Sequence, residues 1–304
     1  MKEKSLKKKS RKWSFAEQWP MILMVIPFMV IFAMMVVIPI IASIVLSFTN
    51  FDAIQFPKFV GFDNYMRMFV SDDVFPIVLK NTLVIAVVVG PIGFLMSFVL
   101  AWFVNEFSAG LRTVLSFMFY APSLVGNAYF VWQILFSGDA YGYINNLLLS
   151  IGIITEPIQW LKTAKYILVI VIVVQVWQSM GVSFLSNISG LQNISRDIYE
   201  AGAIDGIKNR WQELRYITLP SMSSMLLFSA VMQISGAFSV GAVAQALAGY
   251  PSVEYSVDTI VSYMTDVGGT RFEMGYASAI SVVLLLMMVI FRTIVGKLLK
   301  IVTK

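Results

Sequence analysis

The sequence predicts an all-helical integral membrane protein, and three observations carry that prediction. Of its 304 residues, 58% are hydrophobic and 13% are charged, whereas soluble domains are about 45–50% apolar and about 25% charged. The apolar residues gather in runs of about twenty or more, the length that a helix needs to cross a hydrocarbon layer of about 30 Å. The runs show no alternation of polar and apolar residues, which argues against spanning strands.

Six apolar runs predict six transmembrane helices within one membrane domain that covers residues 1–304. Asn127 and Gln133 dilute the third run with polar side chains. Prolines inside spans are tolerated but are expected to kink them. The six predicted spans are residues 20–48, 82–104, 113–136, 166–188, 219–247 and 272–295, which together define a spanning region at 20–295.

The distribution of Lys and Arg predicts the orientation of the spans, because cytoplasmic connections carry an excess of both. Most of the 22 basic residues lie in four pieces: a basic tail at 1–19, the turn that contains Arg112, a loop at about 189–218 and a tail at 296–304. We therefore expect both termini to be cytoplasmic.

The composition also disfavours several classes of function. The chain has no Cys and no His, which removes thiol nucleophiles, disulfides, imidazole bases and the usual zinc or haem ligands, so no metal site is expected. No charged residue lies at the centre of a predicted span, which argues against an ion-coupled secondary carrier. A membrane enzyme is also disfavoured, because the external acids are expected to be solvated loop charges. These acids include Asp72, Asp73, Asp258 and Asp266.

A stretch rich in small residues, IYEAGAIDGIKNRWQELRYITLP (198–220), lies between predicted spans four and five. Asp197 and Glu200 predict a helix start like a capping box, and Gly206 predicts where that helix stops. Because its middle carries so few side chain atoms, the helix could lie close against another protein. The residues alone leave a second interpretation open, that of an amphipathic helix lying on the membrane surface.

A second short helix is expected to follow. Trp211, Leu214 and Ile217 are spaced three residues apart, which predicts that they lie on one side of it. Pro220 then opens the fifth span. The two short helices predict an elbow at the cytoplasmic surface.

The segments EAGAIDG and ITLP together resemble the cytoplasmic signature of permease subunits in binding-protein-dependent ABC importers. That signature reads Glu-Ala-Ala, three residues, Gly, nine residues, then Ile-x-Leu-Pro. Gly202 stands where the second Ala is usual, and ten residues separate Gly206 from Ile217. We expect the extra residue to be absorbed near Lys208 and Asn209. The resemblance implies that the residues docking on an ATPase are Glu200, Ala201, Gly202, Asp205, Gly206, Leu219 and Pro220.

The resemblance covers most of the chain, including the segments FVGFDNYMRMF, NTLVIA and YAPSLVGNAYFVWQILFSGDAYGYINNLL. These look like parts of carbohydrate importer permeases of the maltodextrin, multiple-sugar or glycerol phosphate type. Membership would imply a bacterial or archaeal cytoplasmic membrane, a second homologous permease, two copies of a cytoplasmic ATPase, an extracytoplasmic solute-binding protein and a carbohydrate substrate. A permease for a non-carbohydrate solute remains an alternative.

The chain has no G-x-x-x-x-G-K-[ST] phosphate loop. We therefore expect a non-catalytic transport subunit with no cofactor of its own, whose ATP and Mg are bound by the partner ATPase. Lipid is an expected contact and nucleic acid is not.

Polar residues at mid-membrane depth mark a candidate solute path, because unpaired polar groups are costly in lipid. Amides and aromatic rings suit a sugar, whose hydroxyl groups need donors and acceptors and whose CH faces stack on rings. Packing between helices is the alternative role for each of them. The candidates are Asn127 in span three, Gln175, Trp177, Gln178 and Ser179 in span four, and Gln233, Phe238 and Ser239 in span five.

Overall fold

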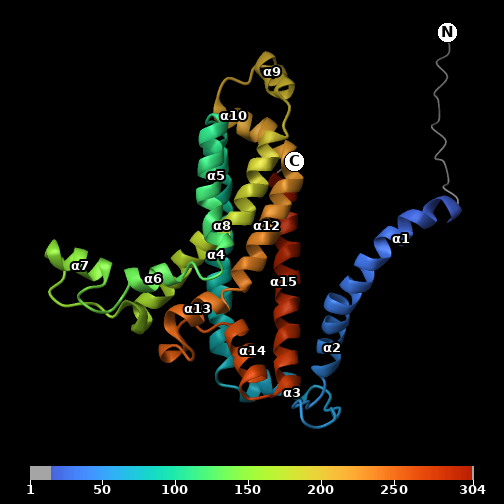
Figure 1. The fold of residues 1–304 in the computed structure, drawn as a ribbon, viewed down its shortest axis with the longest axis vertical. Helices are drawn as coiled ribbons and strands as arrows, with labels where there is room; N and C mark the ends of the chain where they lie inside the picture. The colour runs from blue at the N-terminus through green and yellow to red at the C-terminus, as the bar shows by residue number, and fades with distance from the viewer. Residues whose placement is uncertain (1–14, 303–304) are drawn as a thin grey trace.

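The computed structural model describes residues 15–302 as helices joined by loops (Figure 1). Residues 1–14 of the predicted basic tail lie outside the described residues. The helices are α1 (Phe15–Phe32), α2 (Ile38–Leu46), α3 (Asp63–Met66), α4 (Phe75–Asn105), α5 (Ala109–Leu124), α6 (Phe130–Leu135), α7 (Tyr143–Ser150), α8 (Ala164–Gln192), α9 (Arg196–Ile204), α10 (Arg210–Glu213), α11 (Leu219–Ser221), α12 (Ser223–Phe238), α13 (Gly241–Ala248), α14 (Ile260–Gly269) and α15 (Met274–Val302).

Within the described residues, five helical segments are long and apolar enough to cross a membrane. They correspond to five of the six predicted spans, which confirms an all-helical protein with several spans. Helix α15 runs to Val302, so most of the predicted tail at 296–304 is helix instead. The five segments are Ile22–Leu46, Phe75–Asn105, Ala164–Gln192, Ser223–Ala248 and Met274–Ile301.

The third predicted span, at 113–136, is not one continuous helix. Helix α5 ends at Leu124, where Val125 turns to extended backbone (φ −91°, ψ 102°), and α6 begins only at Phe130. The 16 residues of α5 measure about 24 Å at 1.5 Å per residue, which is less than the hydrocarbon thickness. The break follows Pro122, which lacks an N–H donor, and falls where Gly126 and Asn127 favour a turn.

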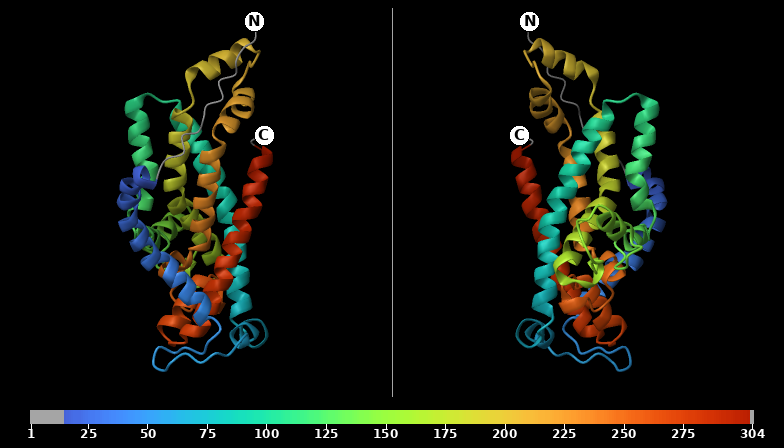
Figure 2. Two further views of the ribbon diagram at one scale, coloured as in Figure 1. Left: turned by 90° about the vertical axis from the view of Figure 1, so that its right-hand side faces the viewer. Right: turned by 90° about the vertical axis from the view of Figure 1, so that its left-hand side faces the viewer.

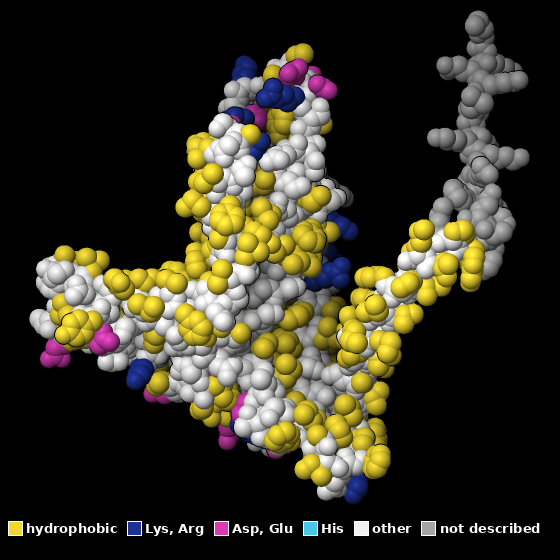
Figure 3. Space-filling view, viewed as in Figure 1, with side chains coloured by type: hydrophobic (Ala, Val, Ile, Leu, Met, Phe, Trp, Pro, Cys, Tyr) yellow, Lys and Arg dark blue, Asp and Glu magenta, His cyan; other side chains and the backbone are white. Residues whose placement is uncertain are grey.

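Helices α4, α8, α12 and α15 form a bundle around which the other elements are arranged (Figures 1 and 2). The α1–α2 limb stands apart from this bundle, and none of its spanning stretch is buried. It touches α15 near its lower end, where the hydroxyls of Ser43 and Ser281 are 2.8 Å apart. Figure 3 shows apolar side chains over the limb and much of the middle of the molecule, with charged side chains near its upper end, along its lower side and at one place beside the limb.

A polar network ties α4 to α14 and α15 at the end far from α9. The carboxylate of Asp72 accepts hydrogen bonds from the hydroxyls of Tyr263 and Tyr276 and from two backbone N–H groups just before and at the start of α4. Asp258 is buried and accepts from the backbone N–H of Ser252 at 3.0 Å. The expectation of solvated loop charges was therefore wrong for Asp72 and Asp258, because both carboxylates organise backbone turns.

Candidate functional site

Helix α9 is the small-residue helix of the predicted elbow. Its cap is Ser195, whose side chain accepts a hydrogen bond from the backbone N–H of Asp197 at 3.2 Å. The predicted capping box of Asp197 and Glu200 was wrong, because the helix begins one residue before Asp197. Gly206 lies just beyond the helix end with φ +96°, a conformation that favours glycine. The predicted stop is confirmed.

The two faces of α9 differ sharply in exposure. Asp197, Glu200, Ala201 and Ile204 share the outward face at spacings of three and four, and Ile204 is 87% exposed. Asp205 is also exposed, at the helix end. The outward face is therefore acidic, with small residues around one apolar side chain.

Gly202 lies on the inward face of α9 and is buried within its own chain. A Cβ at this position would come within 2.5 Å of the Ile217 side chain. This contact gives a physical reason for Gly where the signature usually has Ala. Among the predicted docking residues, Gly202 therefore faces the elbow itself. Leu219 and Pro220 are only partly exposed, at the start of α11.

The second half of the elbow differs from the predicted single short helix. Asn209 caps α10 by accepting from the N–H of Gln212 at 2.9 Å, and a π-helical turn, Leu214–Thr218, comes directly after α10. A π turn holds one residue more than an α turn, so this turn is a second place, besides Lys208 and Asn209, where an extra residue fits. Trp211 is 73% exposed while Ile217 is buried, so the two do not share one side as predicted.

Two contacts join the elbow to the end of α4 nearest to it. Arg210 pairs with Glu106, next to the end of α4, at 2.6 Å, and with Glu213 at 2.8 Å. The rings of Trp102 and Trp211 lie 5.9 Å apart between centroids. Helix α10 is therefore held on α4, whereas the outward face of α9 is left open.

A cavity of about 430 Å³ lies between α8 and α12, with α5, α13 and the segment after α5 completing its lining. Gln175, Gln178 and Ser179 of α8 line it, and Ser239 lines it where α12 ends. These are four of the eight candidates that the sequence predicts for the solute path. All its lining side chains are uncharged.

The amide groups give this cavity its hydrogen-bonding character. Gln175 is buried and donates from Nε2 to the carbonyl of Gly236 at 3.0 Å. The Oε1 atoms of Gln175 and Gln178 have no hydrogen-bond partner among the described residues. Both atoms are buried, and a buried polar atom is costly to leave unpaired, so each amide would gain by turning its oxygen toward a hydroxyl group in the cavity.

The other four candidates lie elsewhere. Gln233 is 1% exposed and donates to the carbonyl of Ser179 at 3.3 Å, while Phe238 is buried against the ring of Phe291. Trp177 packs edge-on against Trp132, and Asn127 is exposed and accepts from the hydroxyl of Tyr129.

Sequence reasoning missed several residues that line the cavity. Met232 and Ser235 belong to them, together with Ser123 and Tyr129 from the broken third run. With Ser239, Met232 and Ser235 have the spacing of one helix face, so this periodicity is the signal that could have found them.

Comparison with known proteins identifies the family. Residues 90–303 match the family described as "Binding-protein-dependent transport system inner membrane component". The chain belongs to this family. It is therefore a membrane permease, a transport component and not an enzyme.

The permease is similar to several curated proteins along most of its length. It is 33% identical to the probable ABC transporter permease protein YesP of Bacillus subtilis, over 89% of this chain and 87% of that protein. It is 34% identical to the lactose transport system permease protein LacF of Rhizobium radiobacter, over 70% and 71%. It is 27% identical to the arabinooligosaccharides transport system permease protein AraP of B. subtilis, over 90% and 86%.

A solved structure shares the fold. The permease superposes on a chain of a bacterial alginate ABC transporter, solved in complex with an alginate-bound periplasmic protein, with a TM-score of 0.77. The match covers 95% of this chain and 96% of that chain at 22% sequence identity, so it bears on the fold alone.

Proposed function

We propose that the permease forms half of the translocation path for a neutral sugar or oligosaccharide in an ATP-driven importer. The observation that carries the proposal is the cavity between α8 and α12, whose uncharged lining includes two glutamines with buried Oε1 atoms that have no partner among the described residues. Hydroxyl groups would donate to the Oε1 atoms of Gln175 and Gln178, and the ring of Tyr129 would pack on a sugar face. The names of LacF and AraP, which transport lactose and arabinooligosaccharides, support a carbohydrate.

The proposed topology has six crossings with both termini in the cytoplasm. Helices α5 and α6 together would make the third crossing, with the broken segment between them next to the cavity. Non-helical backbone at membrane depth is tolerated where it lines a cavity, and Gly126 and Tyr129 do line it. The concentration of Lys and Arg in the elbow and terminal pieces supports this orientation.

The outward face of α9 would dock in a cleft of a cytoplasmic ATPase. Its small residues permit close approach, Ile204 supplies an apolar anchor and Glu200 a partner for a cation. The complete importer would hold this permease, a second homologous permease, two ATPase copies that bind ATP and Mg, and an extracytoplasmic solute-binding protein. ATP-driven closure would then switch the bundle between inward-facing and outward-facing states.

Affinity purification of the native chain and of Glu200→Lys tests this assembly. The native chain is expected to bring along a second permease and an ATPase, whereas the variant loses the ATPase because a like charge replaces the proposed anionic partner. Glu156→Lys, which changes an exposed acid outside the elbow, is the matched control and should retain all subunits. Recovery of the ATPase with Glu200→Lys at native yield would contradict docking through this face.

A further inference from the structure

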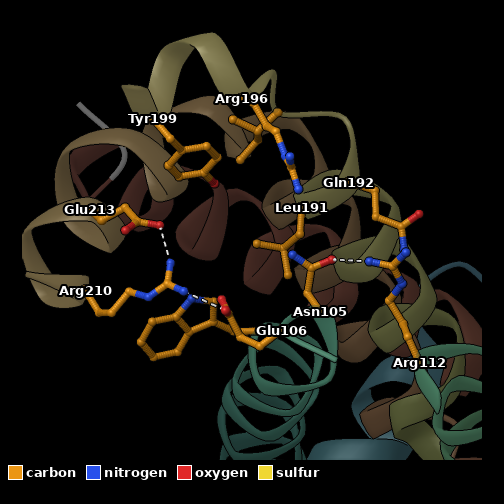
Figure 4. A pocket seen from close by; sticks show the side chains of 11 residues that line it. Asn105, Glu106, Arg112, Leu191, Gln192, Arg196, Tyr199, Arg210 and Glu213 are labelled. Carbon is orange, nitrogen blue, oxygen red and sulfur yellow. Dashed lines mark hydrogen bonds and ion pairs between the residues drawn. The ribbon is translucent and has the colours of Figure 1, made fainter. Parts of the chain in front are cut away.

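A second cavity, of about 600 Å³, lies beneath α9 at the cytoplasmic ends of α4 and α8 and the start of α5 (Figure 4). It is larger than the cavity between α8 and α12, and unlike that cavity it is lined by charged side chains. Three arginines reach it from three different elements, Arg112 from α5, Arg196 from α9 and Arg210 from α10. Nothing in the transport proposal uses this space.

The charges of the cavity are not evenly neutralised. Both acidic residues that line it, Glu106 and Glu213, are paired with Arg210. Arg112 has only the amide oxygen of Asn105, at 3.5 Å. Among the described residues, no carboxylate forms an ion pair with Arg112 or Arg196. Two guanidinium groups therefore remain available on the side of the cavity away from Arg210, and Figure 4 shows both of them extending toward Asn105.

The backbone adds positive potential at the same two arginines. Arg112 lies in the first turn of α5, and Arg196 is the first residue of α9. The N-terminal end of a helix carries a partial positive charge that favours anions and disfavours cations. Two cations therefore lie next to two helix N-termini, and an anion bound between them would stabilise this arrangement of positive charge.

The surroundings place this cavity at the level of lipid headgroups. Trp102 lines it, and Phe103 and Phe107 beside it are 58% and 47% exposed. Tryptophan is enriched where the hydrocarbon layer meets water, and basic pockets between helices on the cytoplasmic side bind anionic headgroups. The exposed phenylalanine rings offer the adjoining surface for acyl chains.

We propose that this cavity binds the phosphate headgroup of an anionic phospholipid. Guanidinium groups match phosphate oxygens with paired hydrogen bonds, so Arg112 and Arg196 are the principal contacts. The hydroxyl of Tyr199 and the side chain amides of Asn105 and Gln192 line the same space and supply further donors. Because Arg196 begins α9 while Arg112 lies at the start of α5, a bound lipid would fasten the elbow to the α4–α5 turn.

Lipid retention by the full chain, purified with the subunits that accompany it, tests the proposal. The complex is placed in nanodiscs of phosphatidylcholine with or without phosphatidylglycerol, and retained lipid is counted by native mass spectrometry. The double variant Arg112→Gln/Arg196→Gln should lose about tenfold or more in phosphatidylglycerol retention, since it removes two charge-assisted contacts. Both side chains are at least partly exposed, so the variant is expected to fold.

Arg215→Gln is the matched control, because Arg215 is an exposed arginine of the elbow that does not line the cavity. Its retention of phosphatidylglycerol should equal that of the native chain. Equal retention by the double variant, or an equal loss in the control, would overturn the proposal. Inorganic phosphate that competes fully with phosphatidylglycerol at millimolar concentration would assign the site to a soluble phosphate and overturn the lipid assignment.

Discussion

At the scale of single residues, three glutamines that look alike in the sequence have different surroundings. Gln175 and Gln178 line the cavity and keep their Oε1 atoms free of partners among the described residues. Gln233 lies outside it. Its Oε1 also has no partner among the described residues, but this atom would stand 2.9 Å from a Cβ placed on Gly93. The glycine therefore makes room for a glutamine that acts as a packing element between α4, α8 and α12.

This difference predicts opposite effects of one substitution. Gln178→Leu removes an acceptor from the proposed solute path, so the KM for uptake should rise by a few-fold to about tenfold, the range expected for one lost hydrogen bond, while thermal stability stays close to native. Gln233→Leu should lower the melting temperature and leave KM unchanged. Uptake kinetics and thermal unfolding, measured on the same two preparations, test both expectations. A raised KM for Gln233→Leu would show that Gln233 contacts the solute and is not only a packing residue.

Gly206 carries a second prediction at this scale. Its φ of +96° is strained for any residue with a Cβ, and more so for a β-branched one. Gly206→Val should therefore displace the end of α9 and abolish uptake, while the protein remains in the membrane because its spans are untouched. Membrane abundance and uptake are measured together, with Gly110→Val as control, since Gly110 has no positive φ and open space around its Cβ. Normal uptake by Gly206→Val would show that the geometry at this end of α9 is not required.

The limits of sequence reasoning at this scale are physical. The stop at Gly206 could be predicted, because a single conformational preference fixes it. The inward position of Gly202 could not, because it depends on Ile217, fifteen positions further along the chain and within a π turn. Ser235 could not be predicted to line the cavity, because serine is common both in helix packing and on polar surfaces.

At the scale of elements, the long spans could be predicted well because apolar length alone decides them. The third span could not, since its break depends on how residues 125–129 turn between α5 and α6. Nor does the apolar pattern reveal the π turns at Ala33–Val37 and Leu214–Thr218, each of which shifts the register of the helix after it. Sequence patterns therefore miss elements whose ends are set by a single backbone hydrogen bond.

The joint between α10 and α4 carries a prediction at this scale. The ion pair of Arg210 and Glu106 is exposed and contributes little stability by itself, but with the contact between Trp102 and Trp211 it makes the two helices one unit. The chain has no native cysteine, so Glu106→Cys/Arg210→Cys provides a single pair for a short flexible cross-linker. The cross-linked permease should keep most of its uptake, because the two helix ends move together.

Uptake before and after cross-linking is the measurement, and each single-cysteine variant, treated with the same reagent, is its control. If cross-linking of the pair blocks uptake while the single variants stay active, α10 separates from α4 in every transport cycle, and the elbow works through α12 instead.

At the scale of the whole molecule, α4 connects two sets of polar contacts, one at each of its ends. It has 31 residues and is about 46 Å long, with Asp72 just before its start and Glu106 just after its end. The Asp72 network holds the first end to α14 and α15, and the joint with α10 holds the other. One unbroken helix therefore links the elbow to the Asp72 network, without an intervening loop.

The contacts of Asp72 make the end of the molecule far from α9 sensitive to acid. Burial of the Asp72 carboxyl opposes its ionisation, but hydrogen bonds from Tyr263, Tyr276 and the N–H groups of Phe75 and Val74 outweigh it and lower the pKa of Asp72 below its ordinary value of 3.8. A carboxyl whose pKa is lowered by folding contributes stability that is fully present above its unfolded pKa and is lost as pH falls through its folded pKa. The network should therefore weaken below about pH 4 and be unaffected between about pH 5 and pH 7.

Replacement of the Asp72 carboxylate by a neutral amide tests this tie in thermal unfolding. Asp72→Asn should lower the melting temperature by about 2–4 °C at pH 7, and the difference from the native permease should shrink as the medium is acidified toward about pH 3. Asp73→Asn changes the exposed neighbour and should do neither. If the difference in melting temperature between Asp72→Asn and the native chain stays constant across this pH range, the contacts at the start of α4 do not depend on an ionised carboxylate.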